Sequence, residues 1–215
     1  MSSYDVILFD LDGTLTDPGS GITNSVAYAL KKYNIEVEDK TTLYKFIGPP
    51  LADSFIKYYG FSKEDAAQAI EYYREYYRSV GIYENEVYNG IEELLKNLQN
   101  KNKQLIVATS KPEIFAKEVL KHFGLDKYFL YIAGGNLDGT RTVKAEVIEY
   151  ALCENGITDK SKAVMVGDRE HDIIGAKANG IDSIGVLFGY GDRNELEAAD
   201  ATYIAKTVEE IEKYI

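Results

Sequence analysis

Residues 6–17 read Val6-Ile7-Leu8-Phe9-Asp10-Leu11-Asp12-Gly13-Thr14-Leu15-Thr16-Asp17, an apolar run followed by two carboxylates. Four consecutive apolar residues predict a buried β-strand. Asp10 and Asp12 can project toward the same side of extended chain, and Gly13 lets the backbone turn after them. One carboxylate could attack phosphorus, while the other, crowded by like charge, is easier to keep protonated and suits general acid and base catalysis. A turn with a capping carboxylate is the competing explanation.

Further apolar runs at residues 105–108, 131–133, 163–166 and 184–187 predict more buried strands. Apolar residues recur with helical spacing in four segments, which begin at Ile91, Phe115, Val147 and Val208. Strands that alternate with helices predict an α/β fold, a Rossmann-like doubly wound parallel sheet covered on both faces. Such sheets bind ligands at the carboxyl ends of their strands, so the residues after each apolar run are the candidates for chemistry.

The alternation is interrupted over residues 16–82, which carry helical patterns but no convincing strand. We predict an inserted helical domain there, with residues 1–15 and 83–215 forming the α/β core. Flexible residues at 18–21 and Gly81 suit a hinge at its edges. Nine of the 18 tyrosines lie between Tyr28 and Tyr77. Aromatic packing within a helical bundle is the simpler explanation for them, and stacking on a substrate ring is the alternative.

Three other strand ends carry polar side chains. Thr109-Ser110-Lys111-Pro112 follows the second strand and precedes a helix, which is typical of an anion site, although helix capping is a competing explanation. Lys144 begins the next helix, where the helix dipole disfavours a cation; a nearby anion would explain it, and a solvated surface lysine is the alternative.

Asp168 follows the fourth strand directly, and Asp172 comes four residues later. Asp168 placed beside Asp10 would form a site of hard oxygen ligands that suits Mg²⁺. Mg²⁺ takes one or two carboxylates together with water and a substrate phosphate.

The composition bounds the partners. Lys and Arg number 24 against 35 Asp and Glu, a net charge of −11, which argues against binding to nucleic acid polymers or anionic membranes. A single phosphate can bind only where a dication and lysines reverse the local sign. The lone Cys153 excludes a disulfide within the chain and is expected to be a packed thiol. Without a signal sequence or a run long enough to span a bilayer, we expect a soluble cytoplasmic protein.

Over essentially its whole length the chain resembles the haloacid dehalogenase superfamily of phosphohydrolases. Residues Asp10 to Thr14 are similar to the first motif of that superfamily, Thr109 to the second, Lys144 to the third, and Gly167-Asp168 with Asp172 to the fourth. The inserted segment corresponds to a helical cap of the first type. The segments around Gly48-Pro49-Pro50, Thr109 and Asp168 look like the phosphoglycolate phosphatase and bacterial 5′-nucleotidase-like branch.

The resemblance implies roles for these residues. Asp10 would be the nucleophile and Asp12 the general acid and base. The Asp10 and Asp168 carboxylates and the Asp12 backbone carbonyl would hold Mg²⁺, with Asp172 as an outer or water-mediated partner. Phosphate oxygens would be bound by Gly13, Thr109, Ser110 and Lys144.

The implied function is a Mg²⁺-dependent phosphomonoester hydrolase that acts on a small soluble phosphate through an aspartyl-phosphate. Asp12 disfavours dehalogenation, because the dehalogenases of the superfamily lack this carboxylate. A sugar-phosphate phosphomutase with the same carboxylates remains the alternative. A phospho-aspartate receiver without turnover fits less well, since receivers have about half this length and lack the cap. The substrate and the oligomeric state stay open.

Overall fold

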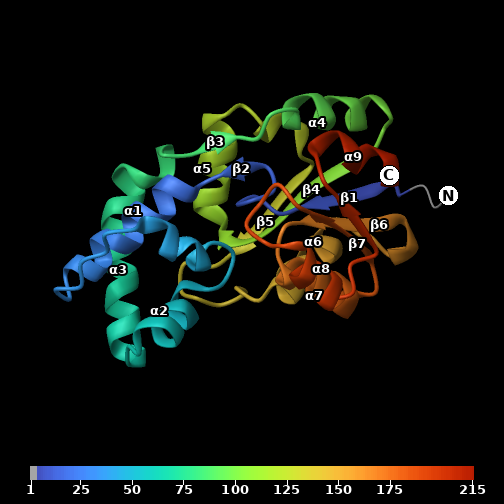
Figure 1. Cartoon of the computed structure of the whole chain (residues 1–215). Helices are drawn as coiled ribbons and strands as arrows, with labels where there is room; N and C mark the ends of the chain where they lie inside the picture. Colours follow the sequence, from blue (N-terminus) through green and yellow to red (C-terminus); the bar gives the residue numbers. More distant parts are fainter. Residues whose placement is uncertain (1–3) are drawn as a thin grey trace. The chain divides into compact units, whose positions relative to one another are not determined.

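The computed structural model describes residues 4–215, which divide into two compact units. Unit 1 comprises the chain up to Asp17 together with Val87–Ile215, and unit 2 is Pro18–Glu86. The chain leaves unit 1 at the short strand β2 (Thr16–Asp17) and returns at β3 (Glu86–Val87) (Figure 1). Unit 2 is therefore an insertion into unit 1.

Unit 1 is built on a parallel sheet, six-stranded within residues 4–215, with the strand order β5-β4-β1-β6-β7-β8. Its strands are β1 (Val6–Phe9), β4 (Gln104–Pro112), β5 (Tyr131–Gly135), β6 (Ala163–Gly167), β7 (Asp182–Val186) and β8 (Tyr203–Ala205). The order runs outward from β1 in both directions, which confirms the predicted doubly wound α/β fold. The edge strand β8 was not predicted from the sequence.

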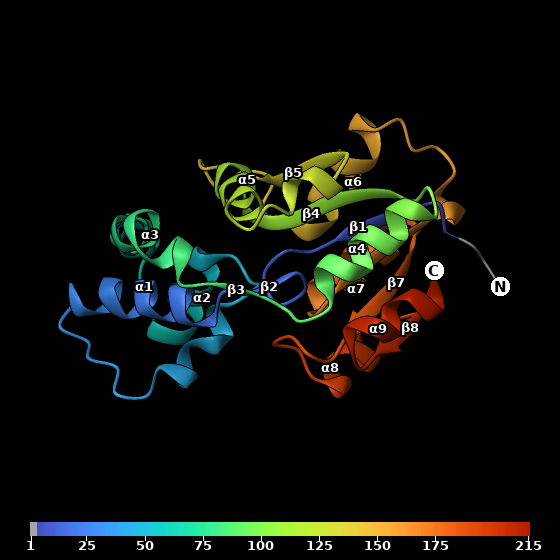
Figure 2. The same ribbon diagram turned by 90° about the horizontal axis from the view of Figure 1, so that it is seen from above.

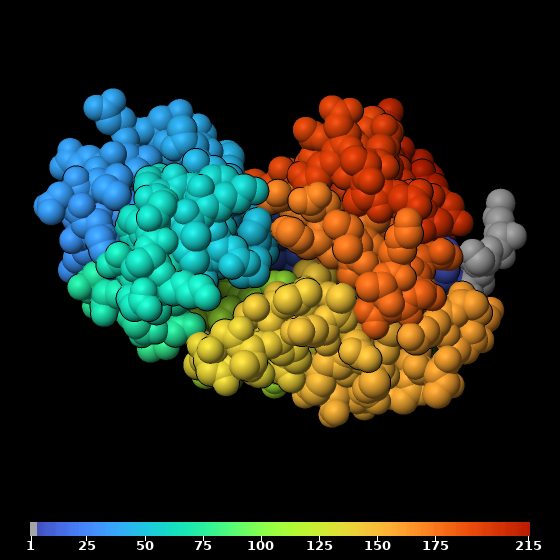
Figure 3. Space-filling view, turned by 90° about the horizontal axis from the view of Figure 1, so that it is seen from below, coloured from blue at the N-terminus to red at the C-terminus, as the bar shows by residue number. Residues whose placement is uncertain are grey.

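Helices cover both faces of this sheet. They are α4 (Ile91–Asn100), α5 (Glu113–His122), α6 (Lys144–Glu154), α7 (Glu170–Asn179), α8 (Arg193–Ala198) and α9 (Val208–Ile211), with 3₁₀ turns at η3 (Asp126–Tyr128), η4 (Lys160–Lys162) and η5 (Glu212–Tyr214). Helices α4 and α9 lie on one face and α6 and α7 on the other (Figures 1 and 2). Seen from below, the surface of unit 1 includes the orange segment that contains α7 (Figure 3).

The core between the sheet and α6 and α7 follows from the two periodicities of the sequence. Alternate strand residues such as Leu8, Ile106 and Met165 point to this face and are fully buried. They meet the apolar stripe of α6, which includes Val147 and Ile148. With both faces covered in this way, the strand ends remain the part of the sheet where polar side chains can gather.

Unit 2 is helical, with α1 (Gly19–Lys31), η1 (Lys40–Phe46), α2 (Leu51–Tyr59), α3 (Lys63–Ser79) and η2 (Gly81–Tyr83). Gly60 ends α2 in the left-handed region at φ 67°, and the Ser62 side chain then accepts a hydrogen bond from the Asp65 backbone amide at 3.0 Å to begin α3. Tyr73 and Tyr77 are buried and stacked, with ring centroids 5.3 Å apart. Aromatic packing therefore accounts for these two tyrosines.

The expectation that Cys153 is a packed thiol is wrong. Cys153 is exposed, because it lies about 100° around α6 from Leu152, the last residue of the buried stripe. Across residues 4–215 the helices are too short or too polar to cross a bilayer.

Candidate active site

The end of β1 places Asp10 and Asp12 in a tight turn. The Asp10 amide donates to the Val166 carbonyl of β6 at 2.9 Å, which continues the sheet to the first carboxylate. The amides of Leu15 and Thr16 both donate to the Leu11 carbonyl, at 2.9 and 3.0 Å, and close the turn. Both carboxylates are thereby fixed at the carboxyl end of the central strand.

Gly13 is required in this turn for two reasons. Its φ of 84° lies in the left-handed region, and a Cβ there would collide with the Asp168 carboxylate. The backbone of the β1 turn and the carboxylate that follows β6 are therefore in direct contact.

Asp168 is held from two sides. The Tyr190 backbone amide donates to Asp168 Oδ2 at 2.8 Å, and Thr14 Oγ1 donates to Asp168 Oδ1 at 3.3 Å. A Cβ on Gly189 or Gly191 would collide with Asp168, so these glycines permit the close approach of the 189–191 backbone. The Tyr190 hydroxyl donates a short hydrogen bond to Asp17.

Lys144 lies in the middle of the carboxylates rather than on the surface. It is only 5% exposed, and its Nζ lies 2.8 Å from Asp10 Oδ1 and 2.8 Å from Asp172 Oδ1. It also donates to the Ala108 carbonyl at 3.2 Å. A nearby anion thus explains the cation at the start of α6, and the surface alternative does not apply.

Asp10, Asp168 and Asp172 form a group whose carboxylate oxygens lie within 4.8 Å of one another. All three residues are buried, and carboxylate oxygens are the ligands that Mg²⁺ prefers. The donor set fits the cation expected from the sequence. The Asp12 carboxylate is not part of this group and faces another partner.

That partner is Lys111, at the end of β4. Its Nζ lies 2.8 Å from Asp12 Oδ1 and 2.7 Å from Asp12 Oδ2, and both side chains are largely buried. The sequence analysis named Lys111 only as part of the Thr109–Pro112 segment and gave it no role of its own. Its position beyond Thr109 and Ser110 is the signal that links it to the strand end.

The pKa values of the carboxylates reflect burial first and charge second. Burial, followed by the charges of Asp172 and Asp10, raises the pKa of Asp168 well above its ordinary value. Burial also raises the pKa of Asp172 to about 6, although Lys144 opposes the shift. Burial raises the pKa of Asp12, and Lys111 opposes that shift in turn. Several carboxylates of like charge are therefore buried close together, and a bound cation would reduce the repulsion between them.

Thr109 and Ser110 lie where β4 becomes irregular, since the register against β5 shifts between Ala108 and Pro112. Thr109 is buried, and its hydroxyl oxygen accepts from the Lys111 amide at 3.3 Å. Ser110 is half-buried. The segment ends at Pro112, which precedes α5, so its polar groups meet the amino-terminal end of a helix.

Tyr88 was missed by the sequence analysis. It packs edge-on against Phe188 with ring centroids 5.1 Å apart. Burial raises the pKa of Tyr88, and the charges of Asp17, Asp168 and Asp12 raise it further. The Tyr88 hydroxyl therefore stays protonated at neutral pH.

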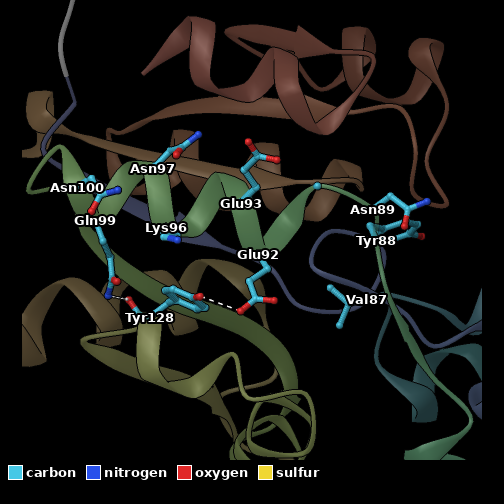
Figure 4. Close-up of a pocket in the computed structure, with 11 residues that line it drawn as sticks. Val87, Tyr88, Asn89, Glu92, Glu93, Lys96, Asn97, Gln99, Asn100 and Tyr128 are labelled. Atoms are coloured by element: carbon cyan, nitrogen blue, oxygen red, sulfur yellow. Dashed lines mark hydrogen bonds between the residues drawn. The ribbon is translucent and has the colours of Figure 1, made fainter.

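A polar groove runs along α4, and Tyr88 is one of the residues that line it. Its lining includes Tyr88, Asn89, Glu92, Asn97 and Tyr128 (Figure 4). Tyr128 donates to Glu92 at 2.9 Å across it. The carboxylates that follow β1 and β6 do not line this groove.

Replacement of Gly189 by alanine should weaken cation binding. Gly189 has no positive φ, so the added Cβ acts only through its collision with Asp168 and the Gly13 carbonyl. Displacement of a residue that orients a metal ligand typically costs 10- to 100-fold in affinity, so we expect the Mg²⁺ dissociation constant to rise by about tenfold or more. Isothermal titration calorimetry with Mg²⁺ measures this change.

Gly156→Ala is the matched control. Gly156 has a φ of 63°, but a Cβ there meets nothing within 4 Å. It should lower stability by about 1–2 kcal/mol through backbone strain and leave Mg²⁺ affinity unchanged. Equal Mg²⁺ affinity in the Gly189→Ala variant and the wild type would show that the 189–191 backbone does not hold Asp168 for a cation.

The fold and these side chains define a class of protein. Buried carboxylates and two lysines with largely buried side chains lie at the carboxyl ends of a doubly wound parallel sheet, an arrangement suited to a phosphate group and a divalent cation. The comparisons agree with this class. The family profile described as haloacid dehalogenase-like hydrolase matches residues 7–186, and the chain belongs to this family.

Three similar proteins illustrate the relationship. A 5′-nucleotidase of Pseudomonas aeruginosa is 48% identical over 200 residues, which are 93% of this chain and 90% of that protein. The tyrosine-protein kinase PtkA of Mycobacterium tuberculosis is 37% identical over 97% of this chain and 72% of its own. The crystal structure of a predicted phosphatase from Clostridium acetobutylicum has a TM-score of 0.97 and 50% identity, covering 99% of this chain and 98% of that one. The chain is therefore an enzyme of the haloacid dehalogenase-like phosphatase class.

Proposed function

We propose that this enzyme hydrolyses small soluble phosphomonoesters through an aspartyl-phosphate on Asp10, with Mg²⁺ as cofactor. The supporting observation is the separation of two carboxylates at one strand end. Asp10 is paired with Lys144 at 2.8 Å, whereas Asp12, two residues later, is paired with Lys111. Carboxylates placed in different environments are suited to different roles, one as nucleophile and one as acid and base.

The proposed reaction has two displacements. A carboxylate oxygen of Asp10 forms a bond to phosphorus while the bond to the leaving oxygen breaks, and Asp12 gives its proton to that oxygen. Asp12 then takes a proton from water as the water attacks phosphorus and Asp10 is released. Lys144 neutralises Asp10 and the phosphoryl group, and Gly13, Thr109 and Ser110 bind phosphate oxygens.

The Asp10 and Asp168 carboxylates and the Asp12 backbone carbonyl would hold Mg²⁺, with Asp172 as an outer partner. When bound, the cation supplies positive charge against the phosphate oxygens. The chain contributes the orientation of these ligands, through the Tyr190 amide on Asp168 and through Lys144 between Asp10 and Asp172.

We further infer that unit 2 acts as the helical cap and limits the substrate to a small molecule. Among such substrates we favour nucleoside 5′-monophosphates, since the relative at 48% identity is a 5′-nucleotidase. Phosphoglycolate is the next candidate, by the resemblance of Thr109 to Pro112 and of the Asp168 segment to that branch. We also propose that the enzyme is cytoplasmic, in keeping with a small soluble metabolite as its substrate.

Phosphate release from a panel of substrates tests this function. The panel contains nucleoside 5′-monophosphates, phosphoglycolate, pyrophosphate and sugar phosphates at fixed Mg²⁺. We expect multiple turnovers on at least one nucleotide, loss of turnover in excess chelator, and recovery when Mg²⁺ is restored. Asp168→Asn should raise the Mg²⁺ requirement sharply.

Other outcomes would overturn the proposal. Isomerisation of a sugar phosphate without release of inorganic phosphate would identify a phosphomutase. Full activity in chelator would remove the metal from the mechanism. A single stable phosphorylation without turnover would favour a receiver.

A further inference from the structure

We propose that Lys111 is a positioning residue that orients the Asp12 carboxylate toward the leaving group. The inference rests on the proposed function, in which Asp12 gives a proton to the leaving oxygen. It adds a role to a side chain that pairs with Asp12, the carboxylate outside the group suited to the cation.

Asp12 differs from the other three carboxylates in how it is held. Each of the others accepts a hydrogen bond from a backbone amide: Asp10 from Leu11 at 2.8 Å, Asp168 from Tyr190 at 2.8 Å and Asp172 from Arg169 at 3.1 Å. Within residues 4–215, both hydrogen bonds that the Asp12 carboxylate accepts come from Lys111 Nζ. A single side chain therefore sets the direction of Asp12.

The two lysines of the site divide the carboxylates between them. Lys144 pairs with Asp10 and Asp172, while Lys111 pairs with Asp12. The Lys111 side chain is 6% exposed and the Asp12 side chain 12%. Because both are so far from bulk water, the ion pair is weakly screened and has a defined geometry.

Repulsion explains why Asp12 needs such a partner. Asp10 and Asp12 are two residues apart and carry the same charge in a buried place, so each pushes the other away. Lys111 approaches from the end of β4 and attracts Asp12 against this repulsion. Without the lysine, Asp12 would turn toward water and away from the bond that breaks.

The requirement for Lys111 should therefore depend on the leaving group. An alkoxide leaves only when it receives a proton, so hydrolysis of an alkyl phosphate needs a correctly placed Asp12. The p-nitrophenolate ion is stable without a proton, so its release from p-nitrophenyl phosphate needs Asp12 much less. A lysine that merely bound the phosphate group would affect both substrates equally.

The experiment compares Lys111→Met with wild type on an alkyl phosphate, phenyl phosphate and p-nitrophenyl phosphate. General acid catalysis contributes about 10²- to 10⁴-fold, so we expect kcat/KM, which reports the step that breaks the ester bond, to fall at least about 100-fold on the alkyl phosphate. On p-nitrophenyl phosphate the fall in kcat/KM should be less than about fivefold, whereas hydrolysis of the aspartyl-phosphate, which is the same for every substrate, should slow equally for all three. Asp12→Asn should give the same graded pattern, and the double variant should lose little more than either single variant.

Two further variants keep the test decisive. Lys111→Arg retains the charge and should recover most of the rate on the alkyl phosphate, even if Lys111→Met folds poorly. Lys117→Met removes an exposed lysine of α5 that pairs with Glu113, and it should match the wild type on every substrate. Mg²⁺ affinity, measured by calorimetry, should be the same in Lys111→Met and wild type.

Three results would overturn the role of Lys111. They are an equal loss of kcat/KM on all three phosphates, no loss on any, or a fall in Mg²⁺ affinity that accounts for the loss. Each is distinct from a failure of the proposed function, which would appear as a wild-type protein that releases phosphate from none of these substrates.

Discussion

Asp10→Asn should lower kcat on p-nitrophenyl phosphate by at least about 10³-fold, because an amide oxygen cannot form the acyl phosphate bond that a carboxylate forms. Asparagine has nearly the same shape, and its side-chain oxygen can still accept from the Leu11 amide. The variant should therefore fold. Steady-state phosphate release, with the thermal midpoint as a check of folding, measures the effect.

Trapping of the covalent intermediate sharpens this result. Wild type quenched in acid during turnover of a labelled substrate should carry label on the protein, and Asp10→Asn should carry none. Asp200→Asn is the control, since Asp200 pairs with Lys177 on the surface. Label that persists in the Asp10→Asn variant would assign the nucleophile to another carboxylate.

The sequence predicted the strands of the six-stranded sheet other than β8, and the strand ends at which the carboxylates lie. Those predictions were possible because local patterns carry them: an apolar run specifies a buried strand, and a parallel sheet brings strand ends to one edge. Lys144 could be recognised as a candidate because a cation at the start of a helix opposes the helix dipole.

Contacts that depend on the order of the strands could not be predicted. Lys111 reaches Asp12 because β4 lies next to β1 and becomes irregular after Ala108, and neither fact is visible in the residues near Lys111. The sequence analysis assigned no role to Gly189 and Gly191. Their role, a close approach to Asp168, arises between segments about twenty residues apart that meet only in the folded sheet.

Lys144→Met should have a large effect on stability as well as on turnover. The substitution leaves Asp10 and Asp172 buried without the cation that lies 2.8 Å from each. Removal of one partner from a buried ion pair typically costs about 3–5 kcal/mol. We expect a loss of that order in the free energy of unfolding at pH 8 without Mg²⁺, measured by urea denaturation.

The loss should shrink in acid. In the wild type, burial raises the pKa of Asp172 from 3.8 in the unfolded chain to about 6 in the folded protein. Protonation of Asp172 therefore contributes fully to the free energy of unfolding below the unfolded-state pKa, and this contribution is lost as the pH rises through the folded-state pKa. Lys144 lowers that pKa, so its removal raises the folded pKa further and extends the decline to higher pH. The deficit of the variant relative to wild type should therefore be larger at pH 8 than at pH 5.

Lys177→Met separates this effect from the loss of any positive charge. Lys177 also lies 2.8 Å from a carboxylate, that of Asp200, but both side chains are exposed. Its removal should change stability by less than about 1 kcal/mol, equally at both pH values. If Lys144→Met also changed the free energy of unfolding by less than about 1 kcal/mol at both pH values, Asp10 and Asp172 would be stabilised by protonation and not by Lys144. The cation suited to Asp10, Asp168 and Asp172 would then have to supply all of the positive charge that the site needs.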